Sequence, residues 1–380
     1  MRRREALLAL AGAGMQFSAT SMGDSGPVVP VGKGGFEQIV CPAAKPRLRQ
    51  TEASMVELPK GRLLLAYSDF YAELTHDDAP ARISAKYSDD LGKTWSRPVT
   101  LVKNTAAMNV MSVSLLRLRS GELAMAYMFK NSHADCSVLY RISTDDGQSF
   151  SDPVQITRRK SFWVMNNDRL IQLRTGRLLA PCQRLDRWPK DRHSLAVVLY
   201  SDDKGKTWKE SKLVDIAANG DGADEPGLIE LADGRVLMYF RTALGSVYQC
   251  HSSDGGATWG NPAPAPLVAP VSPSVIKRVP TTGDLVIVWN RNSPRTRKTD
   301  NSDRFPLTVA VSKDEAKSWL SIKNLDAEHG RAFAYPSITF VRDRILITYY
   351  YSPQAPPFWY SLKLRSEPIQ WLYHPAGTQA

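Results

Sequence analysis

Short apolar stretches alternate with tight polar turns along most of the chain. In six places an apolar stretch runs into a turn and a second apolar stretch follows directly. The turns of these six pairs contain Gly61, Gly121, Gly176, Gly234, Gly283 and Asp343. Paired apolar runs joined by such turns are typical of β-hairpins, so the pattern predicts six hairpins in an all-β chain.

A second turn recurs out of phase with the hairpins, and its pattern is Ser-x-Asp-x-Gly-x-Thr-Trp. Its five copies begin at Ser88, Ser143, Ser201, Ser252 and Ser312, at spacings of 51 to 60 residues. The serine and aspartate can accept hydrogen bonds from backbone N–H groups, and the glycine can take the left-handed conformation. The aromatic residue then plugs the gap between strands. The fifth copy has Ala316 in place of glycine, so we expect a distorted turn there.

The two repeats together predict the architecture. Four strands in each unit of 50–60 residues are typical of a propeller blade. Six hairpins therefore predict a six-bladed β-propeller of four-stranded antiparallel blades, formed as a single domain by residues 30–380. The segment near residues 30–45 is expected to contribute a strand that closes the ring. The alternative is two stacked domains whose repeat is coincidental.

The N-terminus has the composition of a targeting segment. Arg2, Arg3 and Arg4 precede an apolar run over residues 6–15, which is too short to span a bilayer. This pattern resembles a twin-arginine export signal, so we expect residues 1–25 to direct export to the periplasm or the medium. An ordinary amphipathic helix is the alternative. Because no other apolar stretch is long enough to cross a membrane, we expect no stable membrane insertion.

Composition and charge narrow the class of partner. The formal net charge of +11 favours anionic partners, yet the basic residues are scattered and match no nucleic-acid-binding motif. We therefore expect a glycan or a small acidic sugar as partner, and no nucleic acid. The four cysteines, Cys41, Cys136, Cys182 and Cys250, lie far apart, which favours buried free thiols over two disulfides. No histidine or cysteine spacing indicates a metal or a cofactor, and nothing indicates the oligomeric state.

The five recurring turns resemble the Asp-box of the sialidase superfamily, and the resemblance extends from about residue 40 to residue 375. It implies an active site at one end of the propeller axis. Ala334-Tyr335-Pro336-Ser337-Ile338 resembles the segment with the tyrosine nucleophile. The resemblance implies that Glu225 takes the proton of Tyr335 and that Asp78, within residues 76–81, is the acid/base. A neutral phenol suits this role because an anionic nucleophile would be repelled by a carboxylate on the anomeric carbon.

The same resemblance implies an arginine clamp for that carboxylate. Arg241, at the end of Met238-Tyr239-Phe240-Arg241, and Arg304 match two of the three sialidase arginines. At the third position, however, the register set by Gly61 places Glu52, and Arg49 is close by but out of register. A carboxylate there would repel a substrate carboxylate and accept hydrogen bonds from sugar hydroxyls or an amine.

Other residues at strand starts are expected to line the pocket. They are Asn109, Asn166, Asn167, Asp168 and Tyr248. The resulting hypothesis is an exported, retaining exo-glycosidase that hydrolyses a terminal acidic sugar, either sialic acid or a related ulosonic acid. One alternative is a non-catalytic Asp-box propeller that binds glycans or proteins. Another is a different hydrolase or lyase of acidic glycans.

Overall fold

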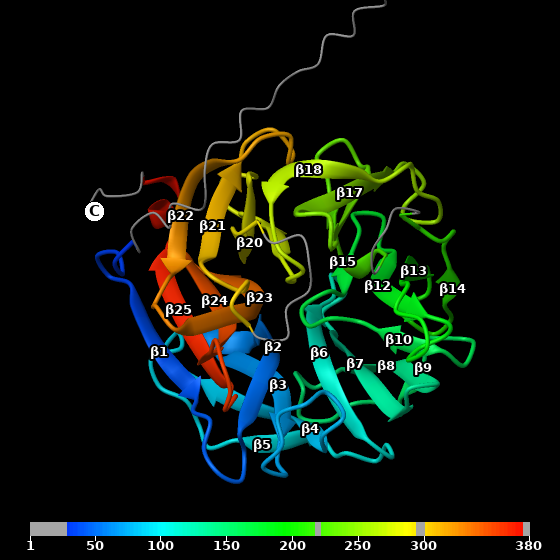
Figure 1. Cartoon of the computed structure of the whole chain (residues 1–380), viewed down its shortest axis with the longest axis horizontal. Helices are drawn as coiled ribbons and strands as arrows, with labels where there is room; N and C mark the ends of the chain where they lie inside the picture. The colour runs from blue at the N-terminus through cyan, green and yellow to red at the C-terminus, as the bar shows by residue number, and fades with distance from the viewer. Residues whose placement is uncertain (1–28, 217–221, 294–300, 375–380) are drawn as a thin grey trace, which may run out of the picture.

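The computed structural model describes residues 29–216, 222–293 and 301–374, and strands dominate it (Figure 1). The helical elements of these residues are two short 3-10 helices, η1 (Pro59–Gly61) and η2 (Ile369–Tyr373). Neither is long or apolar enough to cross a membrane. The predicted export signal, residues 1–25, lies outside the described residues. The all-β prediction is confirmed.

Four of the sheets have four antiparallel strands each. The first contains β2 (Arg49–Glu57), β3 (Leu63–Phe70), β4 (Ala81–Ser88) and β5 (Val99–Val102). The second contains β15 (Asp224–Glu230), β16 (Val236–Arg241), β17 (Ser246–Ser252) and β18 (Ala263–Val268). The third contains β19 (Val275–Arg278), β20 (Leu285–Asn290), β21 (Leu307–Ser312) and β22 (Leu320–Asp326). Each begins with one of the predicted hairpins.

The fourth of these sheets joins the two ends of the described chain. It contains β23 (Arg331–Val341), β24 (Arg344–Pro353), β25 (Ser361–Pro368) and β1 (Phe36–Cys41). β1 pairs antiparallel with β25, so Phe36 lies opposite Ser366. The strand expected near residues 30–45 is therefore present, and it completes a sheet whose other strands come from the C-terminal part of the chain.

A fifth sheet has nine strands and combines two of the predicted hairpins. It contains β6 (Asn109–Arg117), β7 (Leu123–Ser132), β8 (Asp135–Ser143), β9 (Val154–Gln155), β10 (Phe162–Val164), β11 (Ile171–Gln172), β12 (Leu178–Leu185), β13 (Leu195–Ser201) and β14 (Lys209–Glu210). β10 pairs antiparallel with β12 and, through Phe162 and Cys136, parallel with β8. This additional short strand, which the hairpin pattern did not predict, links the two repeats.

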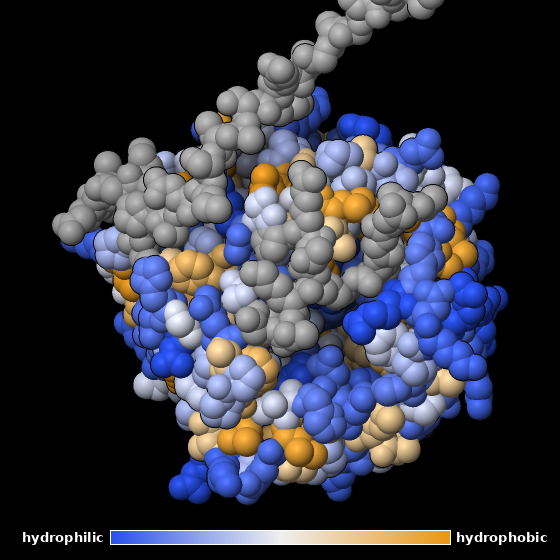
Figure 2. Space-filling view, viewed as in Figure 1, coloured by the Kyte–Doolittle hydropathy of each residue, from blue (hydrophilic) through white to orange (hydrophobic). Residues whose placement is uncertain are grey.

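The sheets surround a central region (Figure 1), with β2, β6, β15 and β23 towards the centre and β1, β5, β9 and β14 at the rim. Hydrophobic clusters join neighbouring sheets. One cluster combines Leu64 and Ile83 of the first sheet with Val113 and Met125 of the nine-stranded sheet. On the face seen in Figure 2, hydrophobic residues form separate small patches among hydrophilic ones. Apolar burial between sheets therefore holds the strands that reach the centre.

The Asp-box turns have the expected hydrogen bonds. In the third copy the Gly205 N–H donates to Ser201 Oγ (2.8 Å), and the Thr207 N–H donates to Asp203 Oδ1 (2.9 Å). Bonds from Thr207 lower the pKa of Asp203 to about 2. Trp208 folds back and donates to the Gly205 carbonyl (2.9 Å). These contacts explain why the motif requires a short acceptor at each polar position.

The fifth Asp-box differs from our expectation. The Ala316 N–H donates to Ser312 Oγ (2.9 Å), as the glycine N–H does in the third copy. Ala316 adopts a left-handed conformation with a φ of 66°. The backbone bonds to Ser312 and Asp314 are therefore kept, and alanine accepts a conformation that favours glycine, but Trp319 Nε1 has no partner among the described residues.

Four inner strands carry the same irregularity. The pairing register shifts between Thr51 and Ser54 in β2, and equivalent shifts occur in β6, β15 and β23. Each shift contains one left-handed residue, and these are Glu52, Ser112, Glu225 and Tyr335. A β-bulge redirects a side chain, and a left-handed residue other than glycine costs about 1–3 kcal/mol. Such strain concentrates at functional sites, so these four positions mark the centre for closer study.

Candidate functional site

A cavity of about 390 Å³ opens where the inner strands meet, and several predicted site residues line it together. The predicted residues that line it are Glu52, Asp78, Glu225, Arg241 and Tyr335. Other residues also line this cavity, among them Asp77, Ser112, Lys130 and His133. Residues from distant parts of the chain thus converge, and three of them, Glu52, Glu225 and Tyr335, stand at the bulges of inner strands.

The phenol of Tyr335 faces the carboxylate of Glu225. Tyr335 Oη lies 3.5 Å from Glu225 Oε1, which is the long limit for a hydrogen bond. Asn166 Nδ2 donates to Glu225 Oε2 at 3.2 Å and fixes the carboxylate. Burial raises the pKa of Tyr335, and the nearby negative charge of Glu225 raises it further. Burial also raises the pKa of Glu225. The pair therefore combines a neutral phenol with a carboxylate that is more basic than usual.

Arg241 is the cation that contacts this pair. Its Nη2 lies 3.1 Å from Glu225 Oε1, and its Nε lies 3.8 Å from Asp224 Oδ2. The side chain is nearly buried, yet Nη1 has no hydrogen-bond partner among the described residues. Arg241 thus lines the cavity with a guanidinium that is incompletely hydrogen-bonded, which makes it the candidate cation for an anionic ligand.

Arg304 lies behind Tyr335 and does not line the cavity. Its Nη1 donates to Tyr350 Oη at 2.8 Å, and its guanidinium carbon lies 5.5 Å from the centre of the Tyr335 ring. The rings of Tyr335 and Tyr350 are 5.9 Å apart. Arg304 therefore adds positive charge near the phenol while supporting its ring.

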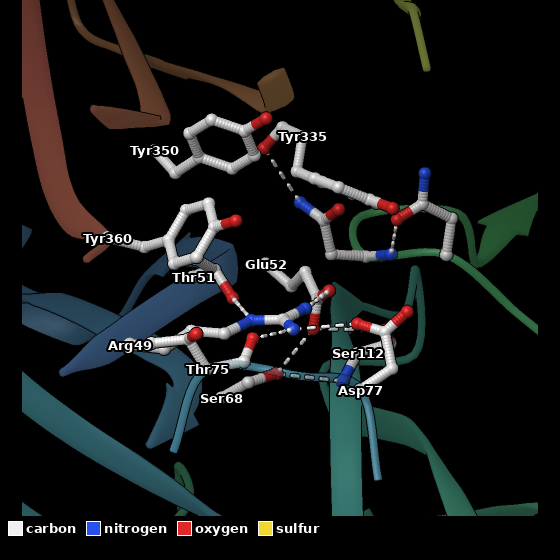
Figure 3. A network of polar contacts seen from close by, with 12 residues as sticks. Arg49, Thr51, Glu52, Ser68, Thr75, Asp77, Ser112, Tyr335, Tyr350 and Tyr360 are labelled. Carbon is white, nitrogen blue, oxygen red and sulfur yellow. Dashed lines mark hydrogen bonds and ion pairs between the residues drawn. The ribbon is translucent and has the colours of Figure 1, made fainter. Parts of the chain in front are cut away.

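Glu52 occupies the position at which the resemblance to sialidases implied a third arginine. Both oxygens of its carboxylate accept hydrogen bonds from neighbouring side chains. Its Oε1 accepts from Arg49 Nη2 (2.9 Å), and its Oε2 accepts from Ser68 Oγ (2.9 Å) and Ser112 Oγ (3.3 Å). Figure 3 shows the guanidinium of Arg49 between Glu52 and Asp77. Arg49 is out of register along β2, as predicted, but its side chain still reaches the site.

The nitrogens of Arg49 are committed to protein acceptors. Nη1 donates to Asp77 Oδ1 (2.6 Å) and to the Thr75 carbonyl (3.0 Å), and Nε donates to Thr51 Oγ1 (3.3 Å). Partial loss of hydration opposes ionisation of Asp77, but Arg49 outweighs it and lowers the pKa of Asp77 to about 2, although 70% of the Asp77 side chain is exposed. Arg49 therefore stabilises the arrangement of Glu52 and Asp77. Because its nitrogens already donate to protein acceptors, other cations of the site have to bind an anionic ligand.

The predicted acid/base, Asp78, lies at the edge of the cavity between two basic groups. Its Oδ2 lies 2.9 Å from His133 Nε2, and its Oδ1 lies 3.4 Å from Lys130 Nζ. Burial raises the pKa of Asp78, but these contacts outweigh it and lower the pKa. Asn109 Nδ2 donates to the carbonyls of Asp77 and Ala79 and so fixes the loop.

None of the five strand-start residues predicted to line the pocket is among its lining residues, and three of them have contacts away from it. Asn167 is buried and donates to the Ala53 carbonyl (2.7 Å), and Asp168 Oδ1 pairs with Lys277 (2.9 Å). These side chains tie neighbouring sheets together and do not line the cavity. Tyr248 packs against Phe240, with ring centres 6.3 Å apart, because β17 is the third strand outward from the centre. These three residues are therefore not among those that line the cavity.

Sequence reasoning missed one wall of the cavity. Lys130 comes from the end of β7, His133 from the turn between β7 and β8, and Phe162 and Trp188 from β10 and the loop after β12. No motif marks these residues. The apolar run Phe162-Trp163-Val164 could have indicated an additional strand. Trp163 itself is buried.

The cysteines and metal-ligating residues add no further site. All four cysteines are free and buried, as expected, and burial raises the pKa of Cys41, Cys136 and Cys250 to about 12. Within residues 29–216, 222–293 and 301–374, no group of three or more His, Cys, Asp or Glu residues could hold a metal ion.

Comparisons with known proteins agree with the fold. The chain is 24% identical over 231 residues to a sialidase from Clostridium perfringens, which covers 54% of this chain and 59% of the relative. It therefore spans less than two thirds of that relative. A Dyadobacter fermentans protein of unknown function covers 87% of this chain and 97% of its own, with 18% identity and a TM-score of 0.69. Trypanosoma rangeli sialidase in complex with sialic acid covers 88% of this chain and 59% of its own, with 17% identity and a TM-score of 0.67.

The family model of the BNR repeat-like domain matches residues 61–347, which is more than half of the chain. This range includes the five Asp-box turns, the inner strands β6 and β15 and the Tyr335 segment. The chain is therefore a sialidase-like protein and belongs to the family of proteins with a BNR repeat-like domain.

Proposed function

We propose that the protein is a sialidase-type glycoside hydrolase that removes a terminal acidic sugar from glycans with retention of configuration. The observation that carries this proposal is the pair of Tyr335 and Glu225 in the cavity, beside the unbonded Nη1 of Arg241. We also infer six blades, because the nine-stranded sheet contains two repeats, β6–β9 and β11–β14, that β10 links. Residues 1–25 are proposed to direct export.

The chemistry follows from the protonation states of the pair. Tyr335 Oη attacks the anomeric carbon while Glu225 accepts its proton, and Asp78 protonates the departing glycosidic oxygen. Asp78 then activates the water that hydrolyses the tyrosyl intermediate. Since burial raises the pKa of Glu225, its carboxylate is a stronger base than an exposed one. A neutral phenol can approach an anomeric carbon that bears a carboxylate without charge repulsion.

The charges of the cavity indicate how the substrate is held. The incompletely hydrogen-bonded guanidinium of Arg241 is the candidate cation for the substrate carboxylate, and Arg304 adds positive charge behind Tyr335. Glu52 cannot grip a carboxylate, and Arg49 is committed to Glu52 and Asp77. Arg241 is therefore the arginine that contacts the substrate carboxylate, Arg304 adds charge without lining the cavity, and Glu52 faces a hydroxyl or amino group of the sugar. Sialic acid and related ulosonic acids carry both kinds of group.

One observation favours a second function, glycan binding without turnover. Lys130 and His133 both contact Asp78 and favour its ionised form, which opposes its role as a proton donor. In the hydrolase, substrate binding has to weaken these contacts. In a binding protein, Asp78 would remain ionised and accept hydrogen bonds from sugar hydroxyls.

The test uses the full chain with a panel of 4-methylumbelliferyl glycosides of N-acetylneuraminic acid, other ulosonic acids and glucuronic acid. We expect the hydrolysis of one acidic glycoside, loss of turnover in Tyr335→Phe, and near-normal turnover in Tyr360→Phe. Tyr360 is a suitable control because its ring lies 5.1 Å from that of Tyr350 but does not line the cavity. NMR of the first product reports the anomeric configuration.

Two results would change the proposal. Saturable binding of an acidic sugar with no hydrolysis of any glycoside would identify the protein as a glycan-binding one. Undiminished turnover in Tyr335→Phe would exclude the tyrosine mechanism, even if the protein proved to be a hydrolase.

A further inference from the structure

His133 forms a pair with Asp78 at the edge of the cavity. His133 Nε2 lies 2.9 Å from Asp78 Oδ2, and both side chains line the cavity and are 36% exposed. His133 stands in the turn between β7 and β8, and Asp78 stands in the loop after β3. Histidine is the side chain that ordinarily gains and loses a proton between about pH 5 and 8. The contact therefore joins a carboxylate to a group that can exchange protons near neutral pH.

Two aromatic side chains fix the orientation of the His133 ring. The centre of the Phe162 ring lies 6.1 Å from that of His133, and the two planes cross at 82°. For Trp188 the distance is 5.9 Å and the angle is 72°. Edge-to-face contacts of this kind favour one orientation of each ring. They therefore keep His133 Nε2 directed at Asp78.

Lys130 is the second basic group beside Asp78. Its side chain is 2% exposed, and Nζ lies 3.4 Å from Asp78 Oδ1 and donates to the Asp77 carbonyl at 2.8 Å. The other charged groups on neighbouring elements contact different partners, in the pairs Asp77 with Arg49, Asp135 with Lys160, and Arg192 with the Trp188 ring. Of an ammonium and an imidazole, the imidazole is the group that ordinarily releases its proton near neutral pH.

The ionised state of Asp78 leaves the proposed reaction in need of a proton. Burial raises the pKa of Asp78, but the contacts with His133 and Lys130 outweigh it and lower the pKa. An ionised carboxylate cannot protonate a glycosidic oxygen. It only accepts hydrogen bonds, so Nε2 of His133 carries the proton of the 2.9 Å contact. The missing proton is therefore next to the carboxylate that has to deliver it.

We propose that His133 and Asp78 form a relay that gives one proton to the leaving group and recovers it in the second step. The proton passes from His133 Nε2 to Asp78 Oδ2 and on to the glycosidic oxygen, while the C–O bond breaks with its electron pair on that oxygen. His133 becomes neutral, which removes a charge that favours the ionised carboxylate. The relay rests on the proposed hydrolase function, and His133 acts through Asp78 without touching the substrate.

The second step restores the starting state. Water attacks the anomeric carbon, and one water proton passes to Asp78 Oδ2 and back to His133 Nε2. The bond to Tyr335 Oη breaks with its electron pair on that oxygen, which takes back its proton from Glu225. Protons therefore balance over the cycle, and no group outside the cavity has to supply one.

The first test compares two leaving groups on one acidic sugar, 4-methylumbelliferyl α-N-acetylneuraminide and 3′-sialyllactose. Methylumbelliferone departs without a proton, whereas lactose needs one. We expect His133→Phe, which keeps an aromatic ring, to lower kcat at pH 7 about 100-fold on 3′-sialyllactose and less than about 3-fold on the methylumbelliferyl glycoside. If the panel identifies another ulosonic acid, the same two leaving groups are compared on that sugar.

His193→Phe is the matched control. His193 Nε2 lies 2.8 Å from Asp215 Oδ1, and its side chain is also 36% exposed, but this pair does not line the cavity. We expect wild-type kcat on both substrates in this variant. Equal losses on both substrates in His133→Phe would overturn the relay, because a role confined to packing would affect both alike.

The pH profile on 3′-sialyllactose separates the relay from packing in a second way. Without His133, Asp78 has to carry the proton itself, and Lys130 still opposes its protonation. We therefore expect the alkaline limb of kcat/KM to move to lower pH in His133→Phe and to stay in place in His193→Phe. An alkaline limb that stays in place in His133→Phe would overturn the relay.

The last test needs no turnover. Carbon-13 NMR of the protein labelled at its aspartate carboxyl groups follows the titration of Asp78, whose signal is identified by its loss in Asp78→Asn. We expect the pKa of Asp78 to be higher in His133→Phe than in the wild type, and unchanged in His193→Phe. An unchanged titration in His133→Phe would overturn the relay even in an active hydrolase. Hydrolysis of no glycoside by the wild type would instead refute the hydrolase function, and the relay with it.

Discussion

Replacing Arg241 with methionine would remove the guanidinium that neutralises two buried carboxylates. The Arg241 nitrogens lie 3.1 Å from Glu225 Oε1 and 3.8 Å from Asp224 Oδ2. At an effective dielectric constant of about 20, Coulomb's law gives roughly 5 and 4 kcal/mol for these contacts. Because water and side chains relax after such a change, breaking a buried ion pair costs about 3–5 kcal/mol. We expect Arg241→Met to lower the free energy of unfolding by this amount at neutral pH.

The loss should depend on pH with a definite sign. Burial raises the pKa of Glu225, and Arg241 is the strongest influence that lowers it. In Arg241→Met the folded-state pKa of Glu225 therefore rises further above its unfolded value. A carboxyl group with a raised folded pKa destabilises the fold at high pH, and this cost disappears as pH falls below its unfolded pKa. The difference in stability between the variant and the wild type should shrink on acidification.

Urea unfolding followed by tryptophan fluorescence measures this difference. It is recorded at about pH 7.5 and about pH 5 for the wild type, Arg241→Met and the control Arg241→Lys, which keeps a positive charge. We expect the lysine variant to lose less stability than the methionine variant. A loss below about 1 kcal/mol in Arg241→Met, or the same loss at both pH values, would refute the electrostatic argument.

Two further predictions concern the turns and the N-terminus. Gly205 and Gly121 both have left-handed backbone conformations, but a Cβ atom at Gly205 would lie 2.3 Å from the Tyr140 ring, whereas nothing lies within 4 Å at Gly121. We therefore expect Gly205→Ala to lower the unfolding free energy by about 3 kcal/mol and Gly121→Ala by about 1 kcal/mol in urea titrations, and equal losses would contradict the steric reasoning. Replacing Arg3 and Arg4 together by lysine should keep the protein in the cytoplasm, as cell fractionation and immunoblotting would show, whereas continued export would exclude a twin-arginine signal.

The sequence predicted the hairpins and Asp-box turns because both depend on local patterns. Alternation of apolar runs with Gly and Asp turns is set by neighbours in the chain, and the side chains of Ser201 and Asp203 bond within their own turn. The extra strand β10 was missed because its run is only three residues long and lies outside the repeat. Because β10 pairs with both β8 and β12, it joins two repeats into the nine-stranded sheet, which was therefore missed as well.

The site was predictable where a motif fixes the register. Tyr335, Glu225 and Arg241 meet in the cavity. The neighbouring positions were less certain because a strand pattern does not show which side chains point towards the centre. Asn167 lies one residue before Asp168, and both side chains turn out to join sheets.

The cavity residues without a motif could not be predicted. Lys130, near the end of β7, and His133, in the turn between β7 and β8, reach the cavity through tertiary packing that no local pattern records. The β2 register shift likewise determines that the Arg49 side chain reaches Glu52 from three residues upstream.

The left-handed residues of the inner strands have a consequence for how this fold changes its chemistry. At Glu52, Ser112, Glu225 and Tyr335, the bulge in the backbone sets the direction of the side chain. The strand pairing on either side does not depend on which side chain stands there. Each bulge is therefore an independent position. It can hold a nucleophile, a base or a recognition group without a change in the pairing of its strand. Glu52 holds one of these four positions, and because each bulge is separate, an exchange of its side chain leaves the directions of the other three unchanged.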